Sequence, residues 1–64
     1  MTRKGTITEI NHPSGMGEIT DANFERISMH LKDLSFTASI DMAVIFEIEM
    51  ENDGLIATRV EPLT

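Results

Sequence analysis

Apolar and polar side chains alternate most regularly from Val44 to Met50. Period-two alternation sends successive side chains to opposite faces of a β-strand. The pattern therefore predicts a strand with Val44, Phe46, Ile48 and Met50 toward the core, and with Ile45, Glu47, Glu49 and then Glu51 toward solvent. The Asp53-Gly54 pair that follows is typical of a hairpin turn, because glycine adopts positive φ freely. A returning strand is expected over Leu55–Val60.

Three further segments have strand character. Arg26–Leu31 alternates, with Ile27, Met29 and Leu31 on one face and Arg26, Ser28 and His30 on the other. In Thr6–Ile10 the two isoleucines have opposite parity, so both can face the core only if the strand contains a β-bulge. Met16–Thr20 is a weak strand, because glycines flank Met16 on both sides, and it needs partners on both edges.

Turn-forming clusters such as "NHPSG", "TDAN" and "NDG" separate these segments at intervals of about ten residues, the rhythm of a meander or barrel. Short strands without a covering helix bury their apolar faces best by closing on one another. The sequence therefore predicts a single all-β domain, residues 1–64, folded as a five-stranded antiparallel barrel. Leu31–Asp41 holds either one helical turn or a loop.

The charge balance restricts the partners. Eleven carboxylates oppose five basic residues, for a formal charge of −6. Tight binding to a phosphate backbone needs clustered Lys and Arg, so this balance argues against it. The chain also has few aromatic side chains on which bases could stack, since it contains three Phe and no Trp or Tyr. There is no cysteine, no apolar run near the ~20 residues of a membrane span and no apolar segment behind "MTRKGT", so a cytoplasmic location is expected.

From Lys4 to Ile19, the sequence "KGTITEINHPSGMGEI" resembles the opening of cold-shock domains without a gap. The second signature of that family, approximately V-F-V-H-F, is similar to Ile27–Leu31. The segment Val44–Val60 is similar to the last hairpin of the family. The resemblance covers roughly Lys4–Val60 and implies an oligonucleotide-binding (OB) barrel that stacks bases of single-stranded RNA or DNA on aromatic side chains.

Most contact positions of that family hold other residue types in this chain. The family's aromatic and basic contact residues correspond, in chain order, to Glu9, Ser14, Met16, Glu18, Ser28, Leu31 and Asp53. His30 matches the histidine of the second signature, and Phe36 stands where a loop aromatic also stacks on bases. A stacked base contributes about 1–3 kcal/mol, whereas micromolar binding amounts to about −8 kcal/mol in total. The ordinary binding mode is therefore expected to be severely weakened.

Two hypotheses follow. In the first, the barrel binds single-stranded RNA or DNA weakly. The expected contacts are Lys4, Arg26, His30 and Lys32 with phosphates or bases, and Met16 and Phe36 as apolar surface. In the second, the barrel is a protein-interaction module whose nucleic-acid face has been lost, as the negative charge and the missing aromatics indicate. The sequence does not fix the oligomeric state.

Neither a cofactor nor a metal site is expected. The two histidines have no cysteine partner, and His12 precedes a proline in a turn. Glu47, Glu49 and Glu51 are spaced about 7 Å apart per step along one strand face, too far for one calcium ion. No buried acid beside an exposed base is evident, so the chain is interpreted as a non-enzyme. His30 is either a base contact or an exposed histidine without a role. Leu31 either joins Met16 in an apolar patch or points into the core.

Overall fold

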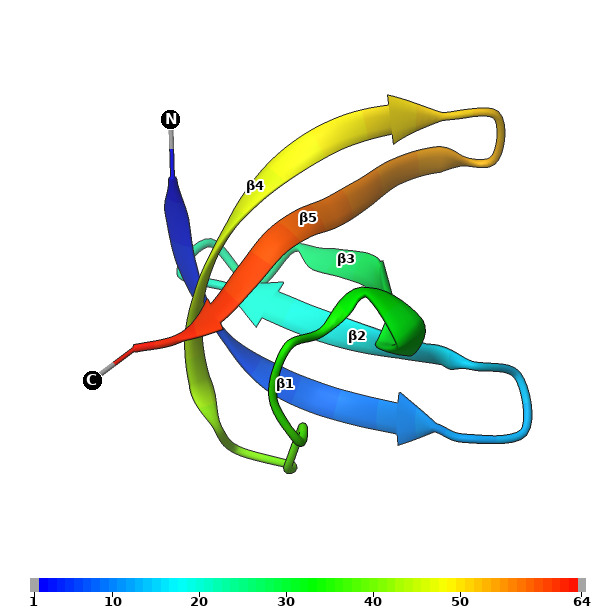
Figure 1. Cartoon of the computed structure of the whole chain (residues 1–64). Coiled ribbons are helices and arrows are strands. Elements are labelled where there is room, and N and C mark those ends of the chain that lie inside the picture. Colours follow the sequence, from blue (N-terminus) through cyan, green and yellow to red (C-terminus); the bar gives the residue numbers. More distant parts are fainter. Residues whose placement is uncertain (1, 64) are drawn as a thin grey trace.

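The strands predicted from side-chain alternation are all present, and most are longer than expected. Figure 1 shows the computed structural model, which describes residues 2–63. The chain forms β1 (Arg3–Asn11), β2 (Met16–Asp21), β3 (Arg26–His30), the short 3-10 helix η1 (Leu31–Asp33), β4 (Ala43–Glu51) and β5 (Gly54–Pro62). The turn that joins the last two strands consists of Asn52 and Asp53, one residue earlier than the predicted Asp53-Gly54, and Gly54 begins β5 with a φ of 119°.

The five strands close into a barrel in the order β1-β2-β3-β5-β4, consistent with an OB-like fold. Four of the five seams are antiparallel, but β3 and β5 run parallel, through the pairs Ser28–Ile56 and Met29–Ala57. The prediction of an all-antiparallel barrel was therefore wrong. The reason is geometric, because strand direction cannot alternate all the way round a closed ring with an odd number of strands.

Two β-bulges bring apolar residues onto the inner face. In β1 the register shifts between Ile7 and Glu9, which leaves Thr8 as an extra residue and turns Ile7 and Ile10 to the same side. This confirms the bulge predicted from the parity of the two isoleucines. The second shift, opposite Ile45–Glu47 of β4, adds one residue to β5 and puts both Ala57 and Val60 in the core.

The core is formed by the inward residues of all five strands. Its fully buried side chains include Phe46, Ile7, Ile19, Met29 and Val44. Partly buried side chains of the segment after β3 cover one opening of the barrel, namely Leu31, Leu34, Phe36, Ala38 and Met42. Met29 is thus a core residue, as the alternation of β3 requires. β2 has partners on both edges, β1 and β3, which confirms the expectation for this glycine-containing strand.

Met50 does not reach the core, contrary to the prediction from β4 alternation. Its side chain is 75% exposed, and its cross-strand partner Leu55 is 51% exposed. In Figure 1 the turn between β4 and β5 projects beyond the other strands. The inward-facing positions at the tip of this hairpin consequently have no opposite strand to pack against.

The segment after β3 contains one helical turn and then a loop, so both alternatives for Leu31–Asp41 are realised in part. The amide of Leu31 bonds to the carbonyl of Gly15, and that of Asp41 bonds to the carbonyl of Ile7. These two bonds fix the ends of the segment against β1 and the β1–β2 turn. Among the described residues, no helix is long and apolar enough to cross a membrane.

Candidate functional site

A row of five outward-facing residues crosses all five strands of the barrel. Cross-strand pairing places Glu9 of β1, Glu18 of β2, Ser28 of β3, Ile56 of β5 and Glu49 of β4 in this row. The register confirms that Glu9, Glu18 and Ser28 are neighbours. In the resemblance to cold-shock domains these three match three of the family's aromatic positions, and two of the three are carboxylates in this chain. Glu9 and Glu18 face each other directly, and like charges in that arrangement destabilise a sheet.

A hollow of about 270 Å³ lies beside this row, between the end of β3 and the β4–β5 hairpin. We call it the acidic hollow. It is lined by Met16, Ser28, His30, Glu51, Asp53, Gly54, Leu55 and Ile56. Ile56 forms an apolar part of its lining: the side chain is only 3% exposed, yet it lies outside the core cluster. Met16 is half-buried and pairs directly with His30 across the sheet.

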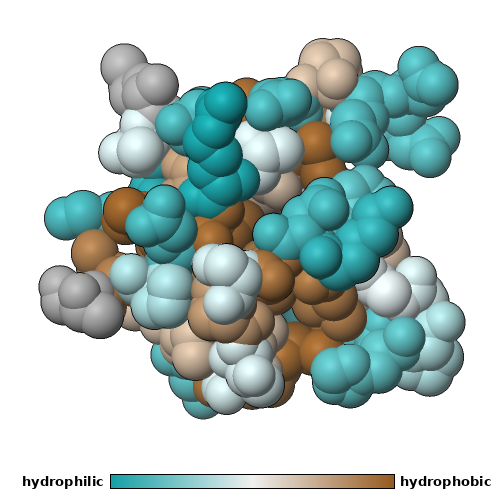
Figure 2. All heavy atoms as spheres, viewed as in Figure 1, coloured by the Kyte–Doolittle hydropathy of each residue, from teal (hydrophilic) through white to brown (hydrophobic). Residues whose placement is uncertain are grey.

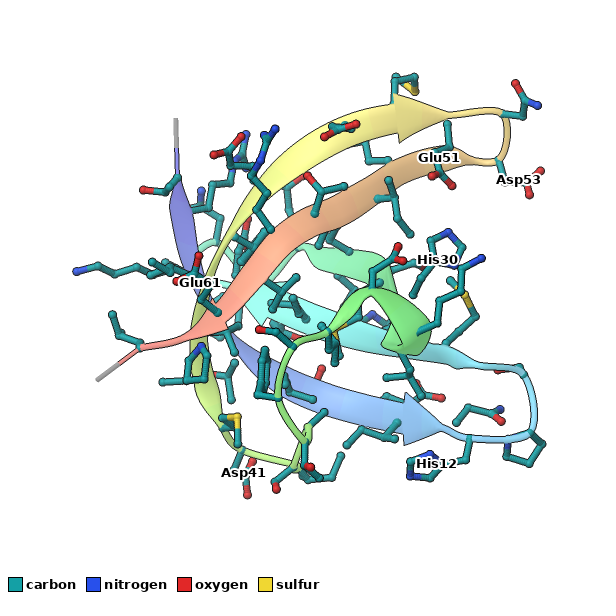
Figure 3. All side chains as sticks on the ribbon, in the orientation of Figure 1. His12, His30, Asp41, Glu51, Asp53 and Glu61 are labelled. Atoms are coloured by element: carbon teal, nitrogen blue, oxygen red, sulfur yellow. The ribbon has the colours of Figure 1, made fainter. Side chains whose placement is uncertain are left out.

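The His30 side chain is in contact with an acidic side chain. Its Nε2 lies 3.2 Å from Oε1 of Glu51. Figure 3 shows His30 at the side of the barrel where the hairpin carries Glu51 and Asp53. Any base or phosphate that approached His30 would therefore meet two carboxylates. Glu49 and Glu47 bind other groups, the Thr58 hydroxyl and the Arg59 guanidinium, so the three strand glutamates do not converge on one point.

A second hollow, of about 370 Å³, lies between the β1–β2 turn and the segment after β3. We call it the Phe36 groove; its main lining residues are His12, Leu31, Lys32, Leu34, Phe36 and Ala38. Lys32 is exposed in η1, whereas the leucines and Phe36 are half-buried and pack against the core. Among residues 2–63, no carboxylate lines this groove. Leu31 therefore belongs to the core edge and to an apolar surface at once.

The structure brings the predicted site residues together in two pairs rather than in one site. Met16 and His30 share the acidic hollow, and Lys32 and Phe36 share the Phe36 groove. Lys4 and Arg26 are exposed near the opposite ends of the strands, where β1 pairs with the end of β2 and β2 pairs with the start of β3. Figure 2, drawn in the same view as Figure 1, shows hydrophobic surface between groups of hydrophilic side chains on this side of the molecule.

Sequence reasoning missed several residues of the two hollows. Ile56 is the most informative: it follows Leu55 and precedes Ala57, so a period-two strand must turn one apolar residue outward. That break in alternation could have indicated the outward position of Ile56. No feature of the sequence indicated the contact between Glu51 and His30, since the two residues are 21 positions apart. His12 was interpreted as a solvated turn residue; it is exposed but also lines the Phe36 groove.

The sequence matches no protein-family model, and a search of curated proteins finds no match. The resemblance to cold-shock domains thus rests on the residues compared above and on a barrel consistent with the OB-like architecture.

Proposed function

We propose that this chain is a small OB-like barrel that binds single-stranded RNA or DNA weakly, through the Phe36 groove. The observation that carries the proposal is the composition of this groove. It combines an aromatic ring, apolar walls and the Lys32 ammonium, and none of the described residues in its lining carries a carboxylate. Stacking on an aromatic side chain together with a cation for the phosphate is the general way in which single strands are held.

The proposal gives the acidic outer row no part in binding. Glu9 and Glu18 stand where the resembling family stacks bases, and they would repel phosphates. One stacked base contributes about 1–3 kcal/mol, so a single groove supports an affinity of roughly millimolar order, for which about 4 kcal/mol is needed. Lys4 and Arg26 lie away from the groove and are not assigned a contact. The role proposed is binding rather than catalysis, and the cytoplasm is the expected location.

Titration of isotope-labelled protein with short oligo-dT and oligo-U at low salt tests this function. Amide shifts are expected at Leu31, Lys32 and Phe36, and they should weaken as salt rises because the phosphate contact releases counterions. Lys32→Gln should lower the affinity and reduce the salt slope by roughly 0.7. Lys4→Gln removes the same charge elsewhere and should change neither. Absence of shifts at millimolar oligonucleotide, or equal effects of the two variants, would refute the proposal.

A second candidate function is favoured by a different observation. The acidic hollow and the adjoining row of carboxylates suit a positively charged protein partner better than a nucleic acid. Binding of such a partner does not depend on nucleic-acid binding.

A further inference from the structure

The acidic hollow combines an apolar lining with a concentration of carboxylates. Ile56 lies inside it at 3% exposure although it faces away from the core. Beside it the apolar lining continues to Leu55, which is 51% exposed. Exposed apolar surface of this kind, bordered by polar residues, is typical of interaction sites.

The negative charge of the chain is concentrated around this hollow. Glu51 and Asp53 line it, and Glu9, Glu18 and Glu49 belong to the adjoining row. These five carboxylates account for most of the net charge of −6, because the remaining six nearly balance the five basic residues. The lining residues that the structure describes include no Lys or Arg, and the histidine among them, His30, is in contact with Glu51. Close like charges repel an anionic ligand and attract a cationic one.

We propose that the acidic hollow binds a basic peptide segment of a protein partner, with one apolar side chain inside the hollow and Lys or Arg residues on either side. A cavity of about 150 Å³ accommodates benzene, so a hollow of about 270 Å³ has room for one aliphatic side chain. The flanking cations meet Glu51 and Asp53 on the hairpin and Glu18 and Glu49 on the row. The flexible thioether of Met16 adapts to the shape of the inserted side chain.

Two synthetic peptides test the apolar part of the proposal. One is an amidated pentapeptide with four lysines around a central leucine, and the other has serine in place of the leucine. Calorimetric titration at low salt should give about ten-fold tighter binding for the leucine peptide, as burial of one aliphatic side chain provides. Shifts of labelled protein should appear at Ser28, His30 and Ile56. Equal affinities, or shifts confined to other strands, would overturn the proposal.

Two double variants with the same net charge as each other test the role of the carboxylates in the hollow. Glu51→Gln with Asp53→Asn removes two charges from the hollow, and Asp41→Asn with Glu61→Gln removes two charges elsewhere. Figure 3 shows that Asp41 and Glu61 lie away from His30 and the hairpin tip. The hollow variant should bind the leucine peptide roughly five-fold more weakly, since one exposed ion pair contributes at most about that factor and ordinary pairs contribute less. The control variant should stay within two-fold of the wild type, which is roughly the effect of distant screened charges.

Equal losses in the two double variants would mean that only net charge attracts the peptide, and would refute the site. Oligo-dT that produces the same shifts at Ser28, His30 and Ile56 would also refute it, because the hollow would then accept nucleic acid. These outcomes are separate from the test of the Phe36 groove, which depends on Lys32 and Phe36. Either of the two proposed binding surfaces can therefore be refuted without affecting the other.

Discussion

Phe24 combines a backbone conformation and an exposure that are both unfavourable for its residue type. It lies in the β2–β3 turn with a φ of 63°, and its side chain is 88% exposed. The left-handed region costs a residue with a Cβ about 1–2 kcal/mol, and asparagine tolerates it best among non-glycine residues. Little burial energy would be lost on replacing the ring.

We therefore expect Phe24→Asn to stabilise the fold by about 1 kcal/mol and to raise Tm by roughly 4–8 °C. Thermal unfolding followed by circular dichroism measures the change. Phe24→Ala is the matched control, because it removes the ring and leaves the backbone conformation unfavourable. An asparagine variant no more stable than the alanine variant would show that the turn stores no such strain.

Asp21 is the buried carboxylate that holds the same turn in place. Its Oδ1 accepts hydrogen bonds from the amides of Asn23 and Glu25 at 2.8 and 3.0 Å, and its Oδ2 lies 3.6 Å from Nη1 of Arg3. Asp21→Ala removes both acceptors and should cost about 1–3 kcal/mol of the free energy of unfolding. Asp21→Asn keeps one oxygen acceptor and loses only the partly exposed ion pair, so its cost in urea denaturation should be clearly smaller. Equal costs would assign the stabilisation to the ion pair instead.

Strand β2 depends on a close approach to its neighbours at Gly17. A Cβ at this position would lie 2.7 Å from Cε of Met29 and 2.9 Å from the backbone oxygen of Glu9. The methionine can move but the backbone oxygen cannot, so Gly17→Ala should destabilise the barrel by about 1–3 kcal/mol. Denaturant unfolding measures this. Ser28→Ala, on the outer face of the adjacent β3, should change stability by less than about 0.5 kcal/mol, and a similar loss in both variants would contradict the explanation.

The parts of the fold that follow from local chemistry could be predicted from the sequence. Alternation predicted the inner face of β4 at Val44 and Phe46. The parity of Ile7 and Ile10 predicted a bulge in their strand if both face the core, and the structure places it at Thr8. Alternation does not show at which residue a strand extends beyond the barrel. Met50 has the correct parity for the core, yet the hairpin tip extends past the strands that would cover it.

The candidate site was less accessible to sequence reasoning, because its residues come together only through the closure of the barrel. The parallel seam between β3 and β5 places Ile56 beside Ser28, and neither residue indicates this pairing by itself. Likewise, His30 matched a nucleic-acid contact by its position in a signature, but its environment is set by Glu51 on a distant hairpin. Resemblance predicts where a side chain lies on a scaffold, whereas its chemistry depends on neighbours that the motif does not include.

For the whole molecule, the arrangement separates the shape of the barrel from the chemistry of its surface. Closure depends on inward aliphatic residues, on Phe46 and on close glycine contacts, and none of these is part of the outer row. The row of Glu9, Glu18 and Ser28 can therefore be changed without altering the core. We therefore expect that substitutions at only a few exposed or half-buried positions can create a base-stacking surface without unfolding the barrel.

The triple variant Glu9→Trp, Glu18→Phe and Ser28→Phe tests that separation directly. It places three aromatic rings next to one another across β1, β2 and β3, and it removes two carboxylates. Since each stacked base contributes about 1–3 kcal/mol, affinity for oligo-dT measured by fluorescence titration should rise at least about ten-fold. The control Glu9→Gln, Glu18→Gln and Ser28→Ala removes the same charges without adding rings, and it should give only the smaller gain from reduced repulsion. If both folded variants bind oligo-dT equally, charge rather than stacking governs binding at this face, and the gain expected from the aromatic rings is wrong.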